Sequence, residues 1–211
     1  KTCPNARLYI LAGNRGQVDM DMVSLFPADT AQQMAGRPVP GLRQDMVKIL
    51  ADLKPGLFRF PGGCIVEGRE LDNRYQWKNT ISDINERKLN ENRWNTEFRH
   101  RPTLDYFQSY GLGFYEYFLL SEQIGAEPLP ILNCGMACQF NTGQLVPMDE
   151  MQPFVQDMLD LIEFANGDAA TTWGAKRAAM GHPKPFNMKY LGVGNEQWGP
   201  QYIERYKLCA R

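Results

Sequence analysis

The chain has 211 residues, 43% of them hydrophobic and 22% charged, and a formal net charge of −1. This is enough apolar material for one buried core. The balanced charge offers no basic face to nucleic acid, and no apolar run approaches the roughly eighteen residues of a membrane span. Neither nucleic acid nor a membrane is therefore an expected partner. The five cysteines do not form a disulfide framework, and the C-x₃-C pair Cys134 and Cys138 is weak support for a metal site.

The two ends read as cuts in a longer protein. The first residue is Lys1 rather than an initiator methionine, and the pattern at 202–211 is helical up to the last residue. The missing signal peptide therefore gives no information about location.

The first residues predict a small antiparallel unit. Two β-like runs, at 7–12 and 17–26, flank Gly13-Asn14-Arg15-Gly16, which has the composition of a hairpin turn. In the second run, apolar residues alternate with aspartates, as in a strand with one side facing solvent. We expect a hairpin that ends an antiparallel module, followed by a Pro- and Gly-rich linker at 27–41.

Helical and strand patterns alternate from there on. The long charged loop among them is of a kind that usually serves function. The predicted elements are a helix at 42–53, a strand at 57–60, a loop at 64–101, a helix at 103–123 interrupted at 111–113, a strand at 128–132, a helix capped by Asp149 and Gln152 and closed by Gly167, a helix at 171–180, a strand at 188–194 and a helix from Pro200.

This alternation of helices and apolar strands indicates parallel βαβ units, and hence an α/β fold. Right-handed crossovers return each strand in the same direction. The polar or glycine-rich strand ends at 59–64, 133–135 and 194–196 are therefore expected on one rim. Such a rim belongs to a (β/α)₈ barrel or to a doubly wound sheet. A full barrel needs roughly 250 residues, so about three βα units of one fit here.

The stretch 190–199 carries the strongest catalytic signal. Its apolar run ends in Gly-Asn-Glu, and Pro200 suits the first turn of a helix, so Asn195 and Glu196 should lie where a strand ends. Chemistry in α/β folds is placed at that end. Glu196 is a candidate catalytic carboxylate and Asn195 a candidate substrate ligand. The alternative is an acid that only complements the helix dipole.

Other polar residues should share this rim. Arg59 interrupts a strand that otherwise reads as core, and a buried arginine needs a carboxylate, catalytic or structural. Glu67 lies three residues after Cys64 at the same mouth, where a solvated loop acid is the alternative. Cys64 is a poor candidate nucleophile, because neither His100 nor His182 lies in a Cys/His signature.

A carboxylate beside flat aromatic rings suits glycoside hydrolysis. One carboxyl group must be protonated to serve the leaving oxygen, and Glu196 beside Trp198 is a candidate, with burial or a neighbouring charge raising its pKa. Trp77 and Trp94 offer faces to sugar rings, with ordinary packing as the alternative. The sequence lacks H-E-x-x-H, G-x-S-x-G, P-loop and G-x-G-x-x-G motifs. We expect no cofactor and no metal in this chemistry.

Several motifs together resemble an α-L-arabinofuranosidase of glycoside hydrolase family 51, over about residues 20–206. The resemblance implies a (β/α)₈ barrel with attached β-sandwich material. It also implies retaining hydrolysis of terminal α-L-arabinofuranosyl groups. The motifs are Arg59-Phe-Pro-Gly-Gly-Cys-Ile-Val-Glu-Gly68, Tyr75-Gln-Trp77, Gly113-Phe-Tyr-Glu-Tyr-Phe118, Gly125-Ala-Glu-Pro128, Asn133-Cys-Gly135 and Gly192-Val-Gly-Asn-Glu-Gln-Trp-Gly199.

The resemblance assigns roles by position in these motifs. Glu196 resembles the general acid/base, and Asn195 the asparagine that binds the sugar 2-hydroxyl. Arg59 resembles an arginine near the nucleophile, Cys64 takes the place of a substrate-contacting Asn or Cys, and Trp94 lies near a subsite tryptophan. The expected substrate-binding set is Asn195, Arg59, Cys64, Glu67, Trp94 and Asn133.

The family's remaining carboxylates fall outside these 211 residues. Its nucleophile is a glutamate of the seventh strand, and another substrate-binding glutamate belongs to the first. Residues 1–26 then correspond to a hairpin remnant of a β-sandwich. Residues 27–211 correspond to the N-terminal half of the barrel, a partial TIM barrel of about strands 2–4. The alternative to an enzyme is that this chain alone is an inactive partial barrel with at most weak sugar binding.

Partners and location follow from the same reading. The expected substrate is an arabinofuranosyl-containing glycan. An open partial barrel exposes strand edges, which favours a homo-oligomer. The sequence does not fix the location. A secreted or periplasmic site is favoured over a cytoplasmic one, because enzymes that attack plant polymers are often exported.

Overall fold

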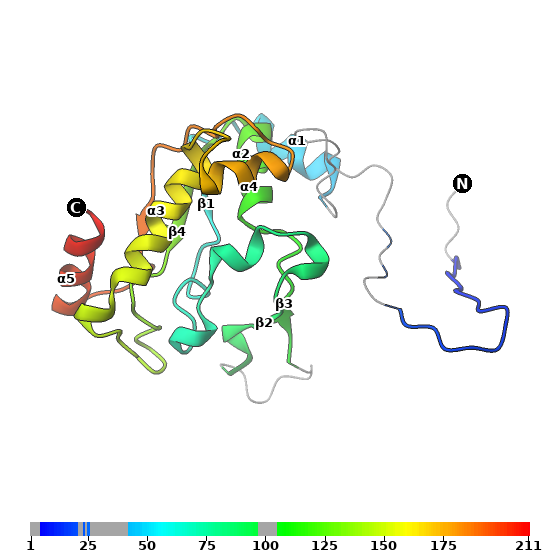
Figure 1. The fold of residues 1–211 in the computed structure, drawn as a ribbon, viewed down its shortest axis with the longest axis horizontal. Helices are drawn as coiled ribbons and strands as arrows, with labels where there is room; N and C mark the ends of the chain where they lie inside the picture. The colour runs from blue at the N-terminus through cyan, green and yellow to red at the C-terminus, as the bar shows by residue number, and fades with distance from the viewer. Residues whose placement is uncertain (1–4, 21–22, 24, 26–41, 97–104) are drawn as a thin grey trace.

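The computed structural model describes residues 5–20, 23, 25, 42–96 and 105–211. From residue 42 onwards the elements form one body, and residues 5–20 extend away from it (Figure 1). All residues from 5 to 20 are exposed and none is in a strand, so the hairpin predicted at 7–12 and 17–26 is absent where it is described. A two-stranded hairpin is marginal without a surface to pack on. The linker at 27–41 lies outside the described residues.

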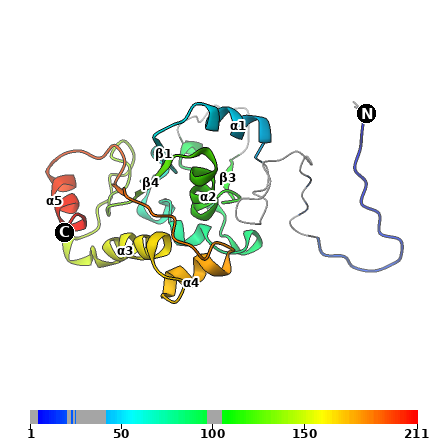
Figure 2. The same cartoon turned by 90° about the horizontal axis from the view of Figure 1, so that it is seen from above.

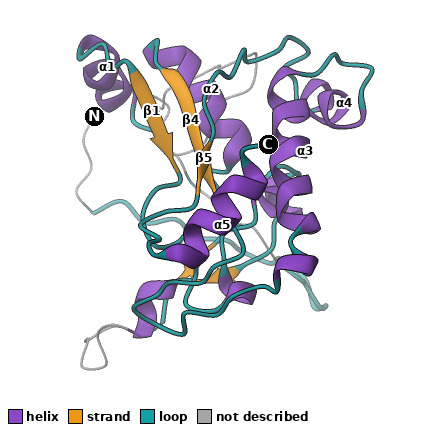
Figure 3. Cartoon of the chain, turned by 90° about the vertical axis from the view of Figure 1, so that its left-hand side faces the viewer, coloured by secondary structure: helices purple, strands orange, loops and turns teal. Residues whose placement is uncertain are grey.

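A parallel sheet positions the site. Its strands are β1 (Leu57–Phe60), β4 (Glu127–Leu132) and β5 (Gly192–Val193), in the order β1-β4-β5. Leu57 pairs with Glu127 and Leu132 with Val193, both in parallel register. The three arrows point the same way in Figure 3, so the polar strand ends meet at one rim, as the sequence predicted.

The strand predicted at 188–194 is shorter in the structure, because only Gly192 and Val193 pair with β4. A Cβ at position 192 would lie 2.2 Å from Cδ1 of Ile131, so that a side chain there would require Ile131 to shift. Glycine therefore allows β5 to approach β4 closely. Tyr190, which the sequence placed in this apolar strand, is 51% exposed.

The described residues form five α-helices, and most of each lies where the sequence predicted a helix. α3 and α4 lie side by side (Figure 2). The helices in the described part of the chain are α1 (Gln44–Asp52), α2 (Phe114–Ile124), α3 (Gln152–Asn166), α4 (Thr172–Ala179) and α5 (Pro200–Cys209).

Two helix starts were predicted wrongly. In place of a helix running from 103, residues 107–108 form β3 (Phe107–Gln108), antiparallel to β2 (Asn90–Glu91), and α2 begins only after Gly113. A Cβ at Gly113 would lie 2.1 Å from the carbonyl oxygen of Thr80, so this glycine marks a close backbone approach. Asp149 lies in the 3₁₀ turn Met148–Glu150 and does not cap α3, which starts at Gln152.

Aromatic side chains fill the core between the sheet and the helices. The Phe60 ring of β1 meets the α2 rings of Phe114 and Phe118 edge-on, at centroid distances of 5.2 and 5.3 Å. Trp77 is 2% exposed, and its indole N–H donates to the Asp157 carbonyl at 3.0 Å. Packing is therefore the role of Trp77, and its proposed face for a sugar ring is not available.

The predicted long loop is present and is fixed at several points. In its described part, 64–96, it forms the short 3₁₀ helices Leu71–Asn73, Trp77–Thr80, Ile84–Glu86 and Arg93–Thr96. Arg87 donates to both carboxylate oxygens of Glu116, at 2.9 and 2.7 Å, and to the Tyr110 carbonyl. Glu116 in turn accepts from the Gly113 amide at the start of α2. This buried pair joins the loop to the first turn of α2.

His182 makes the stability of the fold depend on pH. Its Nε2 lies 3.0 Å from a carboxylate oxygen of Glu122, and its Nδ1 lies 2.7 Å from the Lys184 carbonyl. The hydrogen bond to Glu122 raises the pKa of His182 above 6.5, against opposing effects of burial and of Arg177. A raised folded-state pKa gives stability that is fully present below the unfolded pKa and is lost as the pH rises through the folded value.

We therefore expect the free energy of unfolding to fall as the pH rises from about 6.5, the ordinary histidine pKa, through the raised folded-state pKa of His182. Urea denaturation followed by circular dichroism at several pH values measures this. Glu122→Gln should flatten the dependence, because it removes the charge that raises the pKa of His182. An equally steep dependence in Glu122→Gln would contradict the assignment.

The outer strands of the parallel sheet are β1 and β5. Unpaired strand edges favour pairing with another chain. Static light scattering of the 211-residue chain should therefore give the mass of a dimer or a larger species, and a stable monomer would contradict the prediction.

None of the helices in the described residues combines the length and the apolar character that crossing a bilayer requires.

Candidate active site

Polar residues at the ends of the outer strands β1 and β5 surround the Asn195 side chain. Asn195 is 3% exposed, and its side-chain oxygen accepts a hydrogen bond from the Arg59 guanidinium. Its amide nitrogen donates to Glu67 at 2.6 Å and lies 3.4 Å from a carboxylate oxygen of Glu196. The side chain is thus held at both ends, and it joins the end of β1 to the end of β5.

Arg59 differs from its prediction in two ways. It is exposed, because Leu57 and Arg59 alternate with Phe58 and Phe60, and only the phenylalanines turn toward α2. Its partner is the amide oxygen of Asn195 rather than a carboxylate. The geometry lets Arg59 orient Asn195.

Glu67 is 3% exposed, so the structure does not support the alternative of a solvated loop acid. Burial raises the pKa of Glu67, while hydrogen bonds from Asn195 and Cys138 act in the opposite direction. A carboxyl group with a raised pKa beyond the end of a parallel strand is a candidate functional group.

Asn133 holds the loop that carries Glu67. Its amide nitrogen donates to the carbonyls of Val66, Glu67 and Met136 at 3.1, 3.3 and 2.9 Å. Its side-chain oxygen accepts from the backbone amides of Gly135 and Met136. Both ends of the Asn133 side-chain amide are therefore occupied by backbone groups. Asn133 thus positions the loop that carries Glu67.

Glu196 directly follows Asn195 in an unusual backbone conformation. Its φ is 52°, in the left-handed region that side-chain-bearing residues rarely adopt. Glu196 is exposed, and so is Trp198 two positions later in the chain, at 49%. Burial, one of the two effects expected to act on Glu196, does not occur within the described residues, because they leave the Glu196 side of the rim open.

The Cys64 thiol donates to the Glu196 carboxylate at 3.2 Å. Burial, together with this hydrogen bond, raises the pKa of Cys64 to about 12. The thiol therefore keeps its proton at neutral pH and acts as a donor, which argues against a thiolate nucleophile. Cys64 is placed to orient one oxygen of Glu196.

Trp94 reaches the site through other side chains. It is 37% exposed, and the Arg93 guanidinium lies 4.2 Å from its ring centroid. Arg93 also donates to the Cys138 sulfur at 3.2 Å, and Cys138 hydrogen-bonds Glu67. Trp94 is thus linked to the rim through Arg93 and Cys138.

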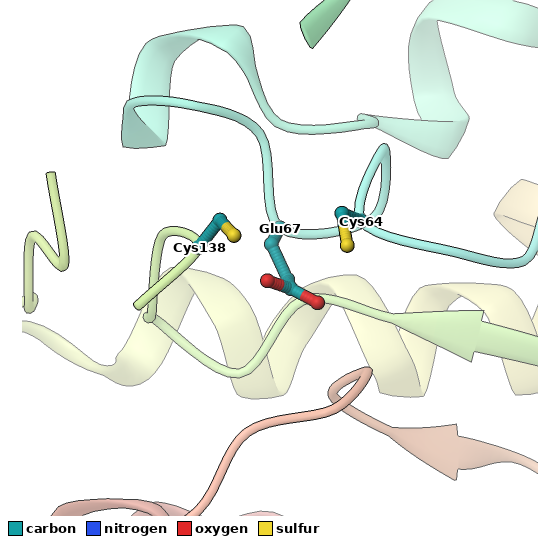
Figure 4. A group of neighbouring side chains, drawn as sticks. All are labelled: Cys64, Glu67 and Cys138. Carbon is teal, nitrogen blue, oxygen red and sulfur yellow. The ribbon is translucent and has the colours of Figure 1, made fainter. Parts of the chain in front are cut away.

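Sequence reasoning did not identify Phe140 or the position of Cys138. Phe140 is 81% exposed and packs against Trp198 at a centroid distance of 5.3 Å, which gives the rim an exposed aromatic edge. Gln139 fixes this edge by accepting from the Trp198 amide at 2.9 Å. The C-x₃-C spacing drew attention to Cys138 but paired it with Cys134, whereas its neighbours in space are Cys64 and Glu67 (Figure 4).

The family model described as α-L-arabinofuranosidase 1 domain matches residues 49–211, which include the whole rim. The chain belongs to the α-L-arabinofuranosidase family. The family resemblance read from the motifs is therefore confirmed, and the rim described above lies in the matched part of the chain.

The relatives are longer proteins named as arabinofuranosidases. The chain is 41% identical over 222 residues to an extracellular exo-α-L-arabinofuranosidase of Streptomyces chartreusis, covering 98% of this chain and 25% of that protein. It is 39% identical to α-L-arabinofuranosidase 1 of Arabidopsis thaliana, covering 95% and 27%. The arabinose-bound structure of the MgGH51 α-L-arabinofuranosidase matches with a TM-score of 0.66 and 30% identity, covering 80% and 26%. The chain thus spans about a quarter of the length of these relatives.

Proposed function

We propose that the full-length protein is a retaining α-L-arabinofuranosidase with Glu196 as its general acid/base. The observation that carries the proposal is the rim itself. Asn195 and Glu196 follow β5 and are hydrogen-bonded to residues that follow β1, in a chain of this family. The three parallel strands are proposed to be about strands 2–4 of a (β/α)₈ barrel, with residues 1–26 the remnant of an attached β-sandwich.

In this mechanism Glu196 first protonates the leaving oxygen and then activates water on the same face of the sugar. Its exposed position leaves it open to the glycosidic oxygen. The Cys64 hydrogen bond orients the carboxylate. The nucleophile is proposed to be a glutamate outside this chain, with its carboxyl group about 5 Å from that of Glu196, as in retaining enzymes.

The other rim residues bind and orient the sugar. Asn195, held by Arg59 and Glu67, presents its amide at a fixed angle to the proposed 2-hydroxyl of arabinofuranose. Such a hydrogen bond can strengthen in the transition state. Trp198 supplies an apolar edge against which further sugar units of a glycan can pack, as aromatic faces commonly do.

The proposal is tested by assaying the full-length protein and the 211-residue chain on an aryl α-L-arabinofuranoside. The full-length protein should turn over and release the sugar first as the anomer of the substrate, which proton NMR detects. The short chain should be inactive, because it lacks the proposed nucleophile. Robust turnover by the short chain, or release of the inverted anomer, would refute this division of roles.

We also propose that the substrate is an arabinofuranosyl-containing glycan and that the protein is exported. The relative from Streptomyces chartreusis is named extracellular, which supports export. Fractionation of the native cells, with arabinofuranosidase activity assayed in each fraction, tests the location.

A further inference from the structure

Three buried side chains at the rim converge in a way that hydrolysis does not require. The sulfur atoms of Cys64 and Cys138 and a carboxylate oxygen of Glu67 all lie within 4.8 Å of one another. The side chains come from the loops after β1 and β4 and gather around the Glu67 carboxylate (Figure 4). Thiolate and carboxylate groups are both ligands of Zn²⁺. We propose that Cys64, Glu67 and Cys138, with Glu196 as fourth ligand, bind one thiophilic divalent ion such as Zn²⁺.

The distances are close to those of a tetrahedral site. Zinc–sulfur bonds of about 2.3 Å and zinc–oxygen bonds of about 2.1 Å place two ligand atoms roughly 3.4–3.8 Å apart. The three donors need to contract only slightly from their present limit of 4.8 Å. Glu196 lies outside this group of three, so its carboxylate, 3.2 Å from the Cys64 sulfur, has to turn toward the other two donors to become the fourth ligand.

The backbone holds these ligands in place before any ion arrives. The Cys138 amide donates to the Gly68 carbonyl at 3.0 Å, which ties the two ligand-bearing loops together. Asn133 adds hydrogen bonds to the carbonyls of Glu67 and Met136, one from each loop. Cys64 and Glu67 are three residues apart on the same turn. Preorganised ligands lose less conformational entropy on binding an ion.

The charges near the site are also suitable. Two thiolates and two carboxylates around one divalent ion leave a net negative charge. Arg93 donates to the Cys138 sulfur, and Arg59 lies one side chain away through Asn195, so both cations offset that charge. Binding displaces the protons of the two thiols to the buffer, as is usual for cysteine ligands.

The site would share its atoms with the sugar-binding rim. An ion held there takes the carboxylate oxygens of Glu67 and Glu196, so ion and sugar could not occupy the rim together. This exclusion rests on the proposed function, whereas ion binding by the four side chains does not. The ion is therefore a ligand of the resting rim and has no part in hydrolysis.

Titration of the reduced 211-residue chain with zinc chloride, by calorimetry or against a chromogenic chelator, tests the proposal. We expect one ion per chain. Cys64→Ser and Cys138→Ser should each weaken binding by at least tenfold, since even second-shell changes at metal sites cost about 10–100-fold. Cys209→Ser is the matched control and should bind as the unmodified chain does, because this half-buried cysteine of α5 is not among the clustered donors.

The absorption spectrum with bound cobalt(II) tests the proposal without any variant. In the unmodified chain it should give the thiolate-to-cobalt charge-transfer absorption and the intense visible bands of a tetrahedral site. This decides the question even where a cysteine variant fails to fold, which circular dichroism would reveal. The proposal is overturned if the unmodified chain shows no saturable Zn²⁺ binding, or if the cobalt spectrum lacks the thiolate band. It is also overturned if both folded cysteine variants keep full affinity.

Discussion

Replacing Glu196 with alanine in the full-length protein should lower kcat by roughly 10²–10⁴-fold on substrates with a poor leaving group, the usual contribution of general acid–base catalysis. The loss should be smaller on an aryl arabinofuranoside with an activated leaving group, because that group departs without protonation. Azide should partly restore turnover by attacking the sugar–enzyme intermediate in place of activated water. Steady-state kinetics on both substrate types, with and without azide, measure these effects.

The backbone at this position calls for a second variant. Because Glu196 has a φ of 52°, alanine there is strained, whereas glycine is not. Equal losses in Glu196→Ala and Glu196→Gly would assign the effect to the missing carboxylate. Glu204→Ala, which changes an exposed acid of α5, is the control and should keep full activity. Unchanged hydrolysis of a polymeric substrate by either Glu196 variant would rule out the assignment.

Breaking the buried pair between Arg87 and Glu116 should destabilise the fold by about 3–5 kcal/mol, the usual cost of leaving one buried charge without its partner. The two side chains are only 2% and 9% exposed. Arg87→Met leaves the Glu116 carboxylate buried, and Glu116→Gln leaves the Arg87 guanidinium buried. Urea denaturation followed by circular dichroism gives the change, with the slope checked for two-state behaviour.

Two further variants separate burial from charge. The double variant Arg87→Met/Glu116→Gln should cost less than the sum of the single changes, because it leaves neither charge alone. Lys48→Ala breaks the exposed pair with Asp52, whose side chains are 72% and 64% exposed, and should change stability by less than about 1 kcal/mol. Equal small effects in the buried and exposed pairs would contradict the role given to Arg87.

Much of the sheet, and the position of the stretch 190–199 at its rim, could be predicted from the sequence, because these signals are local. Apolar runs such as 128–132, each followed by a glycine or an asparagine, predicted the positions of the strands. The chain order then placed Asn195 and Glu196 at a strand end next to Arg59. The resemblance to arabinofuranosidases needed only short motifs, and the family match confirmed it.

The errors arose where distant contacts override local pattern. The glycine at 113 marks close contact with Thr80, a residue 33 positions earlier in the numbering, so helical spacing before it could not reveal the break. In the sequence, Trp77 looks like an aromatic residue that could bind a sugar ring. In the structure its indole N–H donates to the Asp157 carbonyl of α3 inside the core. The hairpin at the start has suitable alternation, yet the described residues offer it no surface.

The long-range partners of the rim were beyond prediction for the same reason. Nothing in the spacing of Cys138 indicates that its sulfur faces Glu67, because the two are brought together by the crossover between β1 and β4. Asn133 looks like a surface ligand at a strand end, but its amide is used by the backbone of two loops. Sequence can place such residues at a rim, but their direction depends on packing.

The hydrogen bond between Arg59 and Asn195 has a consequence for the order of folding. It joins positions 136 residues apart, and the bond from Asn195 to Glu67 spans 128. Contacts between such distant positions form slowly, because the intervening chain must first lose much of its freedom. During synthesis Arg59 and Glu67 leave the ribosome long before Asn195 exists. Of the rim contacts described here, the hydrogen bonds of Asn195 are therefore among the last to form.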